Sequence, residues 1–127
     1  MRSAVDCFEI ALHEHLDALD ARDAERFGRT VSRPGPVCVV GPRGVVTEGF
    51  ANIVDAHRAW FAAPEPWSFQ WREVWRRSGE DFGVALIDVT YRNAAEEAPV
   101  RFLLSLVFAR EDDGEWRLIY DQNTPLG

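Results

Sequence analysis

Four long stretches in the C-terminal half have the spacing of β-strands, three of them with alternating faces and one, 100–110, apolar on both faces as in a central strand, and this pattern constrains the fold more than any other feature of the sequence. A period of two places successive side chains on opposite faces of a strand, so each alternating stretch predicts a β-strand with one buried face. The predicted strands are 67–77, 82–92, 100–110 and 116–123. The segments between them are short and polar, which is typical of hairpin turns. An antiparallel meander is therefore expected.

The N-terminal half has helical rather than strand spacing. Apolar residues recur every three to four positions there, and Asp23 is a suitable N-cap for a short second helix. The predicted helices are 5–19, 24 to about 31, and 51–62, with a small hairpin of residues 37–40 and 45–47 before the last. Helices followed by a meander predict an α+β fold. We expect a cone-shaped, curved antiparallel sheet wrapped around the N-terminal helices and enclosing an apolar pocket.

The size and charge of the chain limit its function classes. The 127 residues predict one domain spanning residues 1–127. A net charge of −7 argues against a nucleic-acid partner, because phosphate binding needs a basic surface. No apolar run approaches the roughly 20 residues of a membrane span, and no signal segment is evident, so a cytoplasmic protein without a membrane partner is expected. No motif indicates a metal or another cofactor, and we expect none.

Asp121 is the main candidate for catalysis. Alternation within strand 116–123 places it on one face with Ile119 and Asn123. The opposite face would carry Trp116, Leu118, Tyr120 and Gln122. If the Asp121 face is buried, desolvation raises the pKa of its carboxyl group toward the range that is useful for proton transfer. The alternative is an exposed aspartate that caps the turn after the strand, and the sequence leaves both open.

Two helix-borne histidines could face Asp121 across a pocket. His15 borders the apolar stripe of the first helix, and His57 shares a face of the third helix with Trp60. Each has a purely structural alternative. His15 would then bond to a backbone carbonyl, and His57 would simply pack beside Trp60.

Aromatic side chains of the third predicted helix and of predicted strands 67–77 and 82–92 could hold a flat, apolar ligand by stacking. With Asn123 and Ile119, these candidate substrate-binding residues are Trp60, Trp67, Trp71 and Tyr91. The alternatives are that the tryptophans belong to the core, or that strand 67–77 turns its aromatic face outward and forms a dimer interface.

The order and spacing of these elements resemble the nuclear transport factor 2-like superfamily, also called SnoaL-like or ketosteroid isomerase-like. The segments that carry the resemblance are 16–24, the 41–44 turn with Gly49, 57–61 and 121–125. The resemblance covers essentially the whole chain and implies the cone-shaped fold. Isomerases, polyketide cyclases, dehydratases, epoxide hydrolases and non-catalytic adaptors share that fold, so it does not define an activity.

The resemblance also bears on individual residues. The general-base aspartate of ketosteroid isomerases matches Gly41, which cannot take a proton, and their oxyanion tyrosine matches His15. The tyrosine that supports it falls near His57, and the second aspartate falls near Ser105 or Leu106. Ketosteroid isomerase chemistry by the usual residues is therefore not expected. Polyketide cyclases of the superfamily are similar in another way, since they use one pocket aspartate with a nearby histidine, as Asp121 with His15 or His57 would.

Together, the residues and the resemblance predict a small cofactor-independent enzyme, namely an isomerase, cyclase, dehydratase or hydrolase. Its substrate would be an apolar, carbonyl-bearing metabolite. Asp121 would move the proton, and His15, His57 and Asn123 would stabilise an oxyanion or position a water molecule. The competing hypothesis is a non-catalytic protein that binds a small molecule in the same pocket. A homodimer is also expected, formed through an outer sheet face that includes Leu118 and Tyr120.

Overall fold

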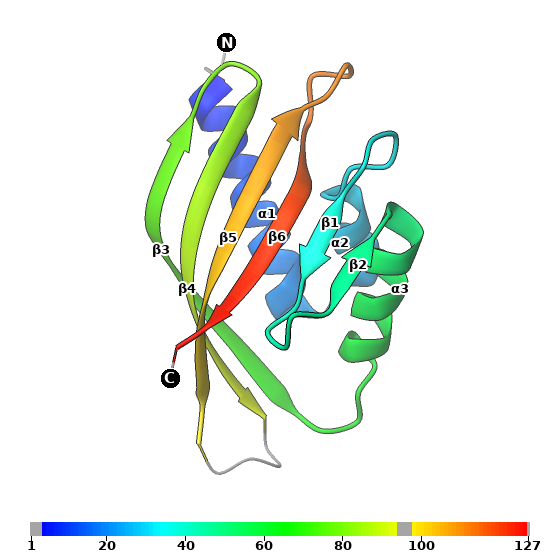
Figure 1. Ribbon diagram of the computed structural model, residues 1–127, viewed down its shortest axis with the longest axis vertical. Coiled ribbons are helices and arrows are strands. Elements are labelled where there is room, and N and C mark those ends of the chain that lie inside the picture. Colours follow the sequence, from blue (N-terminus) through cyan, green and yellow to red (C-terminus); the bar gives the residue numbers. More distant parts are fainter. Residues whose placement is uncertain (1–3, 94–97, 127) are drawn as a thin grey trace.

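The computed structural model describes residues 4–93 and 98–126, and its elements follow the predicted order (Figure 1). The helices are α1 (Ala4–Ala21), α2 (Ala24–Arg29) and α3 (Phe50–Phe61). The strands are β1 (Cys38–Val40), β2 (Val46–Glu48), β3 (Trp67–Ser78), β4 (Phe82–Asn93), β5 (Val100–Arg110) and β6 (Trp116–Pro125). Asp23 caps α2 as predicted, because its side chain accepts a hydrogen bond from the backbone N–H of Arg26 at 3.1 Å. The predicted α+β architecture is confirmed.

All six strands form one open, strongly curved sheet in the order β2-β1-β6-β5-β4-β3. Strands β3 to β6 make the predicted antiparallel meander. The β1–β6 pair is parallel, so the expectation of a wholly antiparallel sheet is wrong at this ladder. These two strands are far apart in the sequence, and no hairpin forces them to run in opposite directions.

Helix α1 runs across the back of the sheet and fills the concave side there (Figure 1). Its buried residues Phe8, Leu12 and Leu16 have no exposed surface. The ring of Phe8 lies directly over Gly83 of β4, where an added Cβ would be 2.7 Å from the ring. This part of the molecule is therefore solid core. No helix in the described part of the chain is long and apolar enough to cross a membrane.

A β-bulge in β6 determines which of its side chains face the core. The β5–β6 pairing skips Ile119, so two residues of β6 there oppose one of β5. Leu118 and Asp121 consequently both face inward, with 0% and 5% of their surface exposed, while Tyr120 lies on the outer face. The expectation that Leu118 belongs to the outer face is wrong, because one extra residue reverses the alternation.

A second bulge has the same effect in β3. The β3–β4 pairing skips Val74. Before it, Trp67 and Phe69 are buried on the inner face, which settles for this half of the strand the direction that the sequence left open. After it, Trp75 turns outward and is 52% exposed, so it does not share the face of Trp67.

Candidate functional site

A cavity of about 340 Å³ lies between α3 and the strands β4, β5 and β6, with the β1–β2 turn at its rim. Its lining is mostly apolar and comprises Val39, Gly41, Pro42, His57, Trp60, Tyr91, Phe102 and Asn123. The predicted pocket between helix and sheet is therefore bounded by α3 alone. Helix α1, the other predicted wall, contributes no residue to it because it packs directly on the sheet.

Asp121 is buried in the sheet beside this cavity. It is paired with Val39 of β1 and Leu106 of β5, and Val39 lines the cavity. The side-chain nitrogen of Asn123, another lining residue, lies 3.4 Å from Oδ1 of Asp121. Burial raises the pKa of the Asp121 carboxyl group to about 7. Of the two possibilities for this residue, the buried acid is confirmed, and it can exchange a proton near neutral pH.

Asn123 has a fixed orientation next to that acid. Its side-chain nitrogen donates to the backbone carbonyl of Val40 at 2.9 Å. A carbonyl oxygen only accepts hydrogen bonds, so the amide nitrogen must be the atom on this side of the residue. Asn123 thus links the β1 backbone, the Asp121 carboxyl group and the cavity.

His57 lines the cavity from α3 as a neutral imidazole. Its Nδ1 is 2.8 Å from the carbonyl oxygen of Ile53, so Nδ1 carries the hydrogen and Nε2 retains a lone pair. Desolvation lowers the pKa of His57, although the hydrogen bond to Ile53 opposes this effect. The ring is stacked on Phe27 at a centroid distance of 4.1 Å. His57 can therefore accept a proton or a hydrogen bond at the cavity.

His15 is sealed in the core and does not line the cavity. The Thr30 hydroxyl donates to the carbonyl of Phe27 at 2.6 Å, so it must accept from Nδ1 of His15 at 2.7 Å. Nε2 of His15 then has no hydrogen-bond partner within residues 4–93 and 98–126. Burial, and to a smaller extent repulsion by His57 when that ring is protonated, lowers the pKa of His15 to about 3. The partner of His15 is a threonine hydroxyl rather than the backbone carbonyl considered above.

The predicted aromatic residues are not all at the cavity. Trp60 and Tyr91 line it, and the indole nitrogen of Trp60 donates to the Tyr91 hydroxyl at 3.5 Å. Trp67 is stacked behind Trp60 with a centroid distance of 4.5 Å. Trp71 lies elsewhere, against His13 of α1 at 5.2 Å. The β-bulge leaves Ile119 out of the β5–β6 pairing, and its side chain lines a different hollow beside the β1–β2 hairpin.

Three lining residues other than Gly41 were not predicted: Val39, Pro42 and Phe102. Phe102 was predictable from the sequence, because it lies two residues before Leu104 on the inner face of β5, a strand that is apolar on both faces. Val39 and Pro42 were not predictable from their own sequence, because the parallel pairing of β1 with β6 brings them to the cavity. Among the described residues, no group of three or more His, Cys, Asp or Glu side chains is placed to hold a metal ion.

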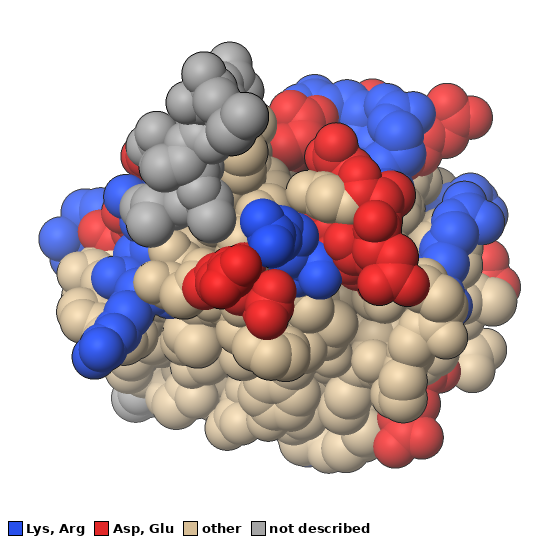
Figure 2. All heavy atoms as spheres, turned by 90° about the horizontal axis from the view of Figure 1, so that it is seen from above, with Lys and Arg blue, Asp and Glu red and all other residues tan. Residues whose placement is uncertain are grey.

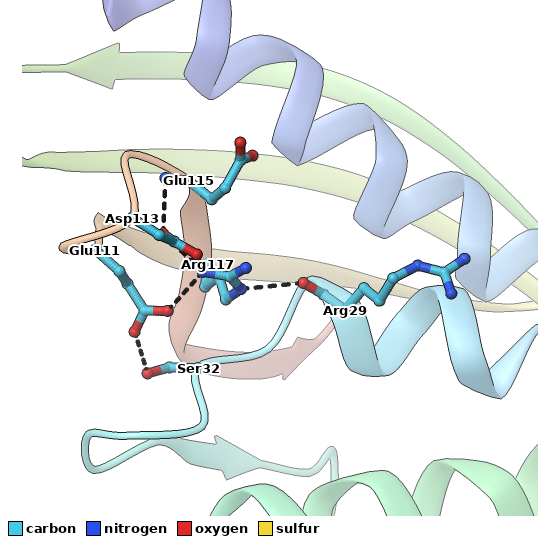
Figure 3. Close-up of polar contacts among 6 residues, drawn as sticks. All are labelled: Arg29, Ser32, Glu111, Asp113, Glu115 and Arg117. Carbon is cyan, nitrogen blue, oxygen red and sulfur yellow. Dashed lines mark hydrogen bonds and ion pairs between the residues drawn. The ribbon is translucent and has the colours of Figure 1, made fainter.

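A second polar cluster lies at the opposite end of β6 (Figure 3). Arg117 donates to Glu111 at 3.0 Å, to Asp113 at 2.9 Å and to the backbone carbonyl of Arg29 at 3.3 Å. The Ser32 hydroxyl donates to Glu111 at 2.6 Å. A hollow of about 440 Å³ opens beside these residues, but its central charges already bind one another. We interpret this cluster as structural, because its hydrogen bonds and ion pairs connect the β5–β6 turn to the end of α2. The smaller, apolar cavity is therefore the candidate site.

Comparison with known families gives one match that spans most of the chain. The family model described as the SnoaL-like domain matches residues 9–123. That range includes Asp121, Asn123 and both walls of the cavity. No curated protein sequence is a significant match to the chain.

Solved structures match the fold closely at low sequence identity. A candidate dehydratase of the NTF2-like family from Streptomyces avermitilis gives a TM-score of 0.84 at 19% identity, covering 97% of this chain and 96% of that one. A ketosteroid isomerase-like protein from Erwinia carotovora atroseptica gives 0.82 at 14% identity, covering 100% and 99%. A candidate calcium/calmodulin-dependent protein kinase type II association domain from Thiobacillus denitrificans gives 0.80 at 23% identity, covering 94% of each chain. These neighbours establish the fold alone.

Proposed function

Because the chain belongs to the SnoaL-like domain family, we propose that it is a small general acid/base enzyme that needs no cofactor. Its substrate would be an apolar, carbonyl-bearing metabolite bound between α3 and strands β4 to β6. The observation that carries the proposal is the position of Asp121, a buried acid with a pKa of about 7 in contact with the cavity residue Asn123. An acid or base is most effective when its pKa is close to the working pH.

The roles of the other residues follow from their hydrogen bonds. In the proposed reaction, ionised Asp121 removes a proton from the carbon next to the substrate carbonyl, and the electron pair moves onto the carbonyl oxygen as an enolate. The Tyr91 hydroxyl accepts from Trp60, so its own proton is free to donate to that oxygen. The lone pair on Nε2 of His57 can orient a substrate hydroxyl or a water molecule. Return of the proton to a different carbon would complete an isomerisation.

Alpha-proton exchange tests this proposal without knowledge of the natural substrate. We expect the protein to catalyse deuterium incorporation from D₂O into bicyclic ketones such as 2-tetralone, followed by NMR. Asp121→Asn should lower the rate by about 10²-fold or more, because the proton carrier is lost. Asp88→Asn is the matched control, since Asp88 lies outside the cavity and pairs with Arg72 and Arg101. Equal exchange rates in the Asp121→Asn variant and the wild type would refute the assignment.

A non-catalytic ligand-binding protein is the second candidate. Two observations favour it: Gly41, at the position of the ketosteroid isomerase base, lines the cavity without a proton-transferring group, and His15 is sealed away from it. In that case 2-tetralone would bind to the wild type and to the Asp121→Asn variant with similar affinity, and neither protein would accelerate exchange.

A further inference from the structure

Arg22 has a backbone conformation that normally requires glycine. It follows the last residue of α1 and has a φ of 56°, in the left-handed region. The surrounding hydrogen bonds are those of a helix C-terminus, with the N–H of Asp23 donating to the carbonyl of Ala18 at 3.0 Å. Glycine is usual at this position because a Cβ atom is strained there. An arginine here therefore implies that its side chain has a role that compensates for the strain.

The side chain of Arg22 covers Trp67, the first residue of β3. The guanidinium carbon is 4.1 Å from the centroid of the Trp67 ring, and Nη2 donates to the Trp67 backbone carbonyl. The indole N–H of Trp67 is buried and has no hydrogen-bond partner among the residues that the structure describes. Because Trp67 has no polar anchor of its own, its ring is positioned by the groups stacked on its two faces.

Trp60 occupies the other face of Trp67. The two indole rings are nearly parallel, with an interplanar angle of 11° and a centroid distance of 4.5 Å. The Arg22 guanidinium carbon, at 4.1 Å from the Trp67 centroid, is too close to share that face, so the order of the stack is Arg22, Trp67, Trp60. Trp60 is half-buried and lines the cavity, which places the end of the stack at the candidate site.

The second face of Trp60 has no parallel partner among the described rings. Four other aromatic rings surround it at centroid distances of 5.4 to 6.3 Å, all tilted or edge-on. They are His57, Phe61, Phe69 and Tyr91. A flat ring is the ligand shape that would complete the stack, because parallel-displaced aromatic surfaces attract one another beyond simple apolar burial.

We propose that Arg22 is a positioning residue that holds Trp67 and Trp60 as a stacking platform, so that the cavity selects flat, unsaturated ring systems over saturated rings of the same skeleton. The inference rests on the proposed function in one respect, since it requires a ligand in this cavity. It adds the ring class of that ligand. It also adds a role for Arg22, which does not itself line the cavity.

The test compares two ligands and measures their dissociation constants by equilibrium dialysis. The flat ligand is 2-acetylnaphthalene and the saturated one is 2-acetyldecahydronaphthalene. We expect the wild type to prefer the flat ligand, and Arg22→Gly and Arg22→Ala to reduce this preference roughly five- to tenfold, the size of one aromatic stacking contact. Arg22→Gly relieves the backbone strain and Arg22→Ala retains it, so a loss common to both comes from the side chain.

Arg29→Ala is the matched control, because Arg29 is exposed near the end of α2 and does not line the cavity. A second readout needs no ligand: the coupled circular dichroism of the stacked indoles should weaken in Arg22→Gly as it does in Trp67→Phe. An unchanged ligand preference in both Arg22 variants would overturn this inference and leave the proposed function intact. Failure of the wild type to bind either ligand would overturn both.

Discussion

Asp121 and His15 have opposite effects on how stability depends on pH. Burial raises the pKa of Asp121 to about 7 and lowers the pKa of His15 to about 3, so both side chains are neutral in the fold between these values. In the unfolded chain, Asp121 ionises above about pH 4 and His15 becomes charged below about pH 6.5. As pH rises from 4 to 7, Asp121 therefore lowers stability while His15 raises it. His57, whose pKa is also lowered chiefly by desolvation, acts in the same direction as His15.

Asp121→Asn should separate these opposing contributions. Asparagine cannot ionise, so the variant lacks the loss of stability that the wild type suffers as pH rises from about 4 to 7. Each pKa unit is worth ~1.4 kcal/mol, so at pH 8 the variant should be more stable than the wild type by on the order of 4 kcal/mol, and the difference should vanish near pH 4. Urea unfolding from pH 4 to 8 measures this. Parallel pH profiles for the two proteins would contradict a raised pKa.

Asp88→Asn is the control for that experiment. Although desolvation acts to raise the pKa of Asp88, hydrogen bonds from Arg72 and Arg101 and their charges hold it below its usual value. Any stabilisation from Asp88 is therefore already present above the unfolded pKa and does not change between pH 5 and 8. The free energies of unfolding of this variant and the wild type should differ by a constant over that range.

Sequence reasoning located part of the site at the residue scale. Periodicity and the family resemblance singled out Asp121, His57, Asn123 and Trp60, which lie at or beside one cavity. His15 has the same helical spacing and is nevertheless sealed. What seals it is the packing of Phe27 and Phe108, from α2 and β5, around its ring. Contacts between residues so far apart in the sequence have no local signal.

At the scale of whole elements, the type and order of helices and strands were predictable, but the faces of β3 and β6 were only partly so. A strict alternation gives the right faces on only one side of each bulge: in β3 the faces are reversed after Val74, and in β6 they are reversed before Ile119. A bulge is a mismatch between two paired strands, so it depends on the partner strand as much as on its own sequence. This is why Leu118 was assigned to the wrong face, and why Trp75 does not share the inner face of Trp67.

The packing of α1 on β4 supports a prediction at the same scale. Gly83→Ala should destabilise the protein by about 1–3 kcal/mol, because the new Cβ would be 2.7 Å from the rigid ring of Phe8 in a closed core. Gly79→Ala is the control, since its nearest contact, the carbonyl oxygen of Phe82, is at an ordinary 3.9 Å. Chemical denaturation gives both values. Adding Phe8→Leu should recover part of the loss in the Gly83 variant but not in the Gly79 variant, and equal effects in both would contradict the steric account.

At the scale of the whole molecule, the outer face of the sheet carries exposed apolar side chains that no described helix covers. Cross-strand pairing aligns Tyr120, Val107 and Val84 in one row that ends at Arg77, and it places Leu86 and Trp75 in the next row after Gln122 and Ser105. Val84 is 38% exposed and Trp75 is 52% exposed. In Figure 2 this face lies along the lower edge, where few charged side chains are visible. An exposed apolar row of this kind is typical of an interface.

We therefore predict a homodimer formed through this outer face, with Tyr120 at the interface and Leu118 excluded from it because Leu118 is core. A two-fold interface uses the same patch on both protomers, so Val84→Glu places two charges in one desolvated contact. Light scattering at micromolar concentration should give the mass of a dimer for the wild type and of a monomer for this variant.

Val45→Glu, at a 65% exposed position beside the β1–β2 turn, carries the same change in charge and should remain dimeric. A monomeric wild type would contradict the interface. Because the cavity is lined by residues of the inner sheet face, α3 and the β1–β2 turn of one chain, 2-tetralone should bind equally well to the wild type and to the Val84→Glu variant.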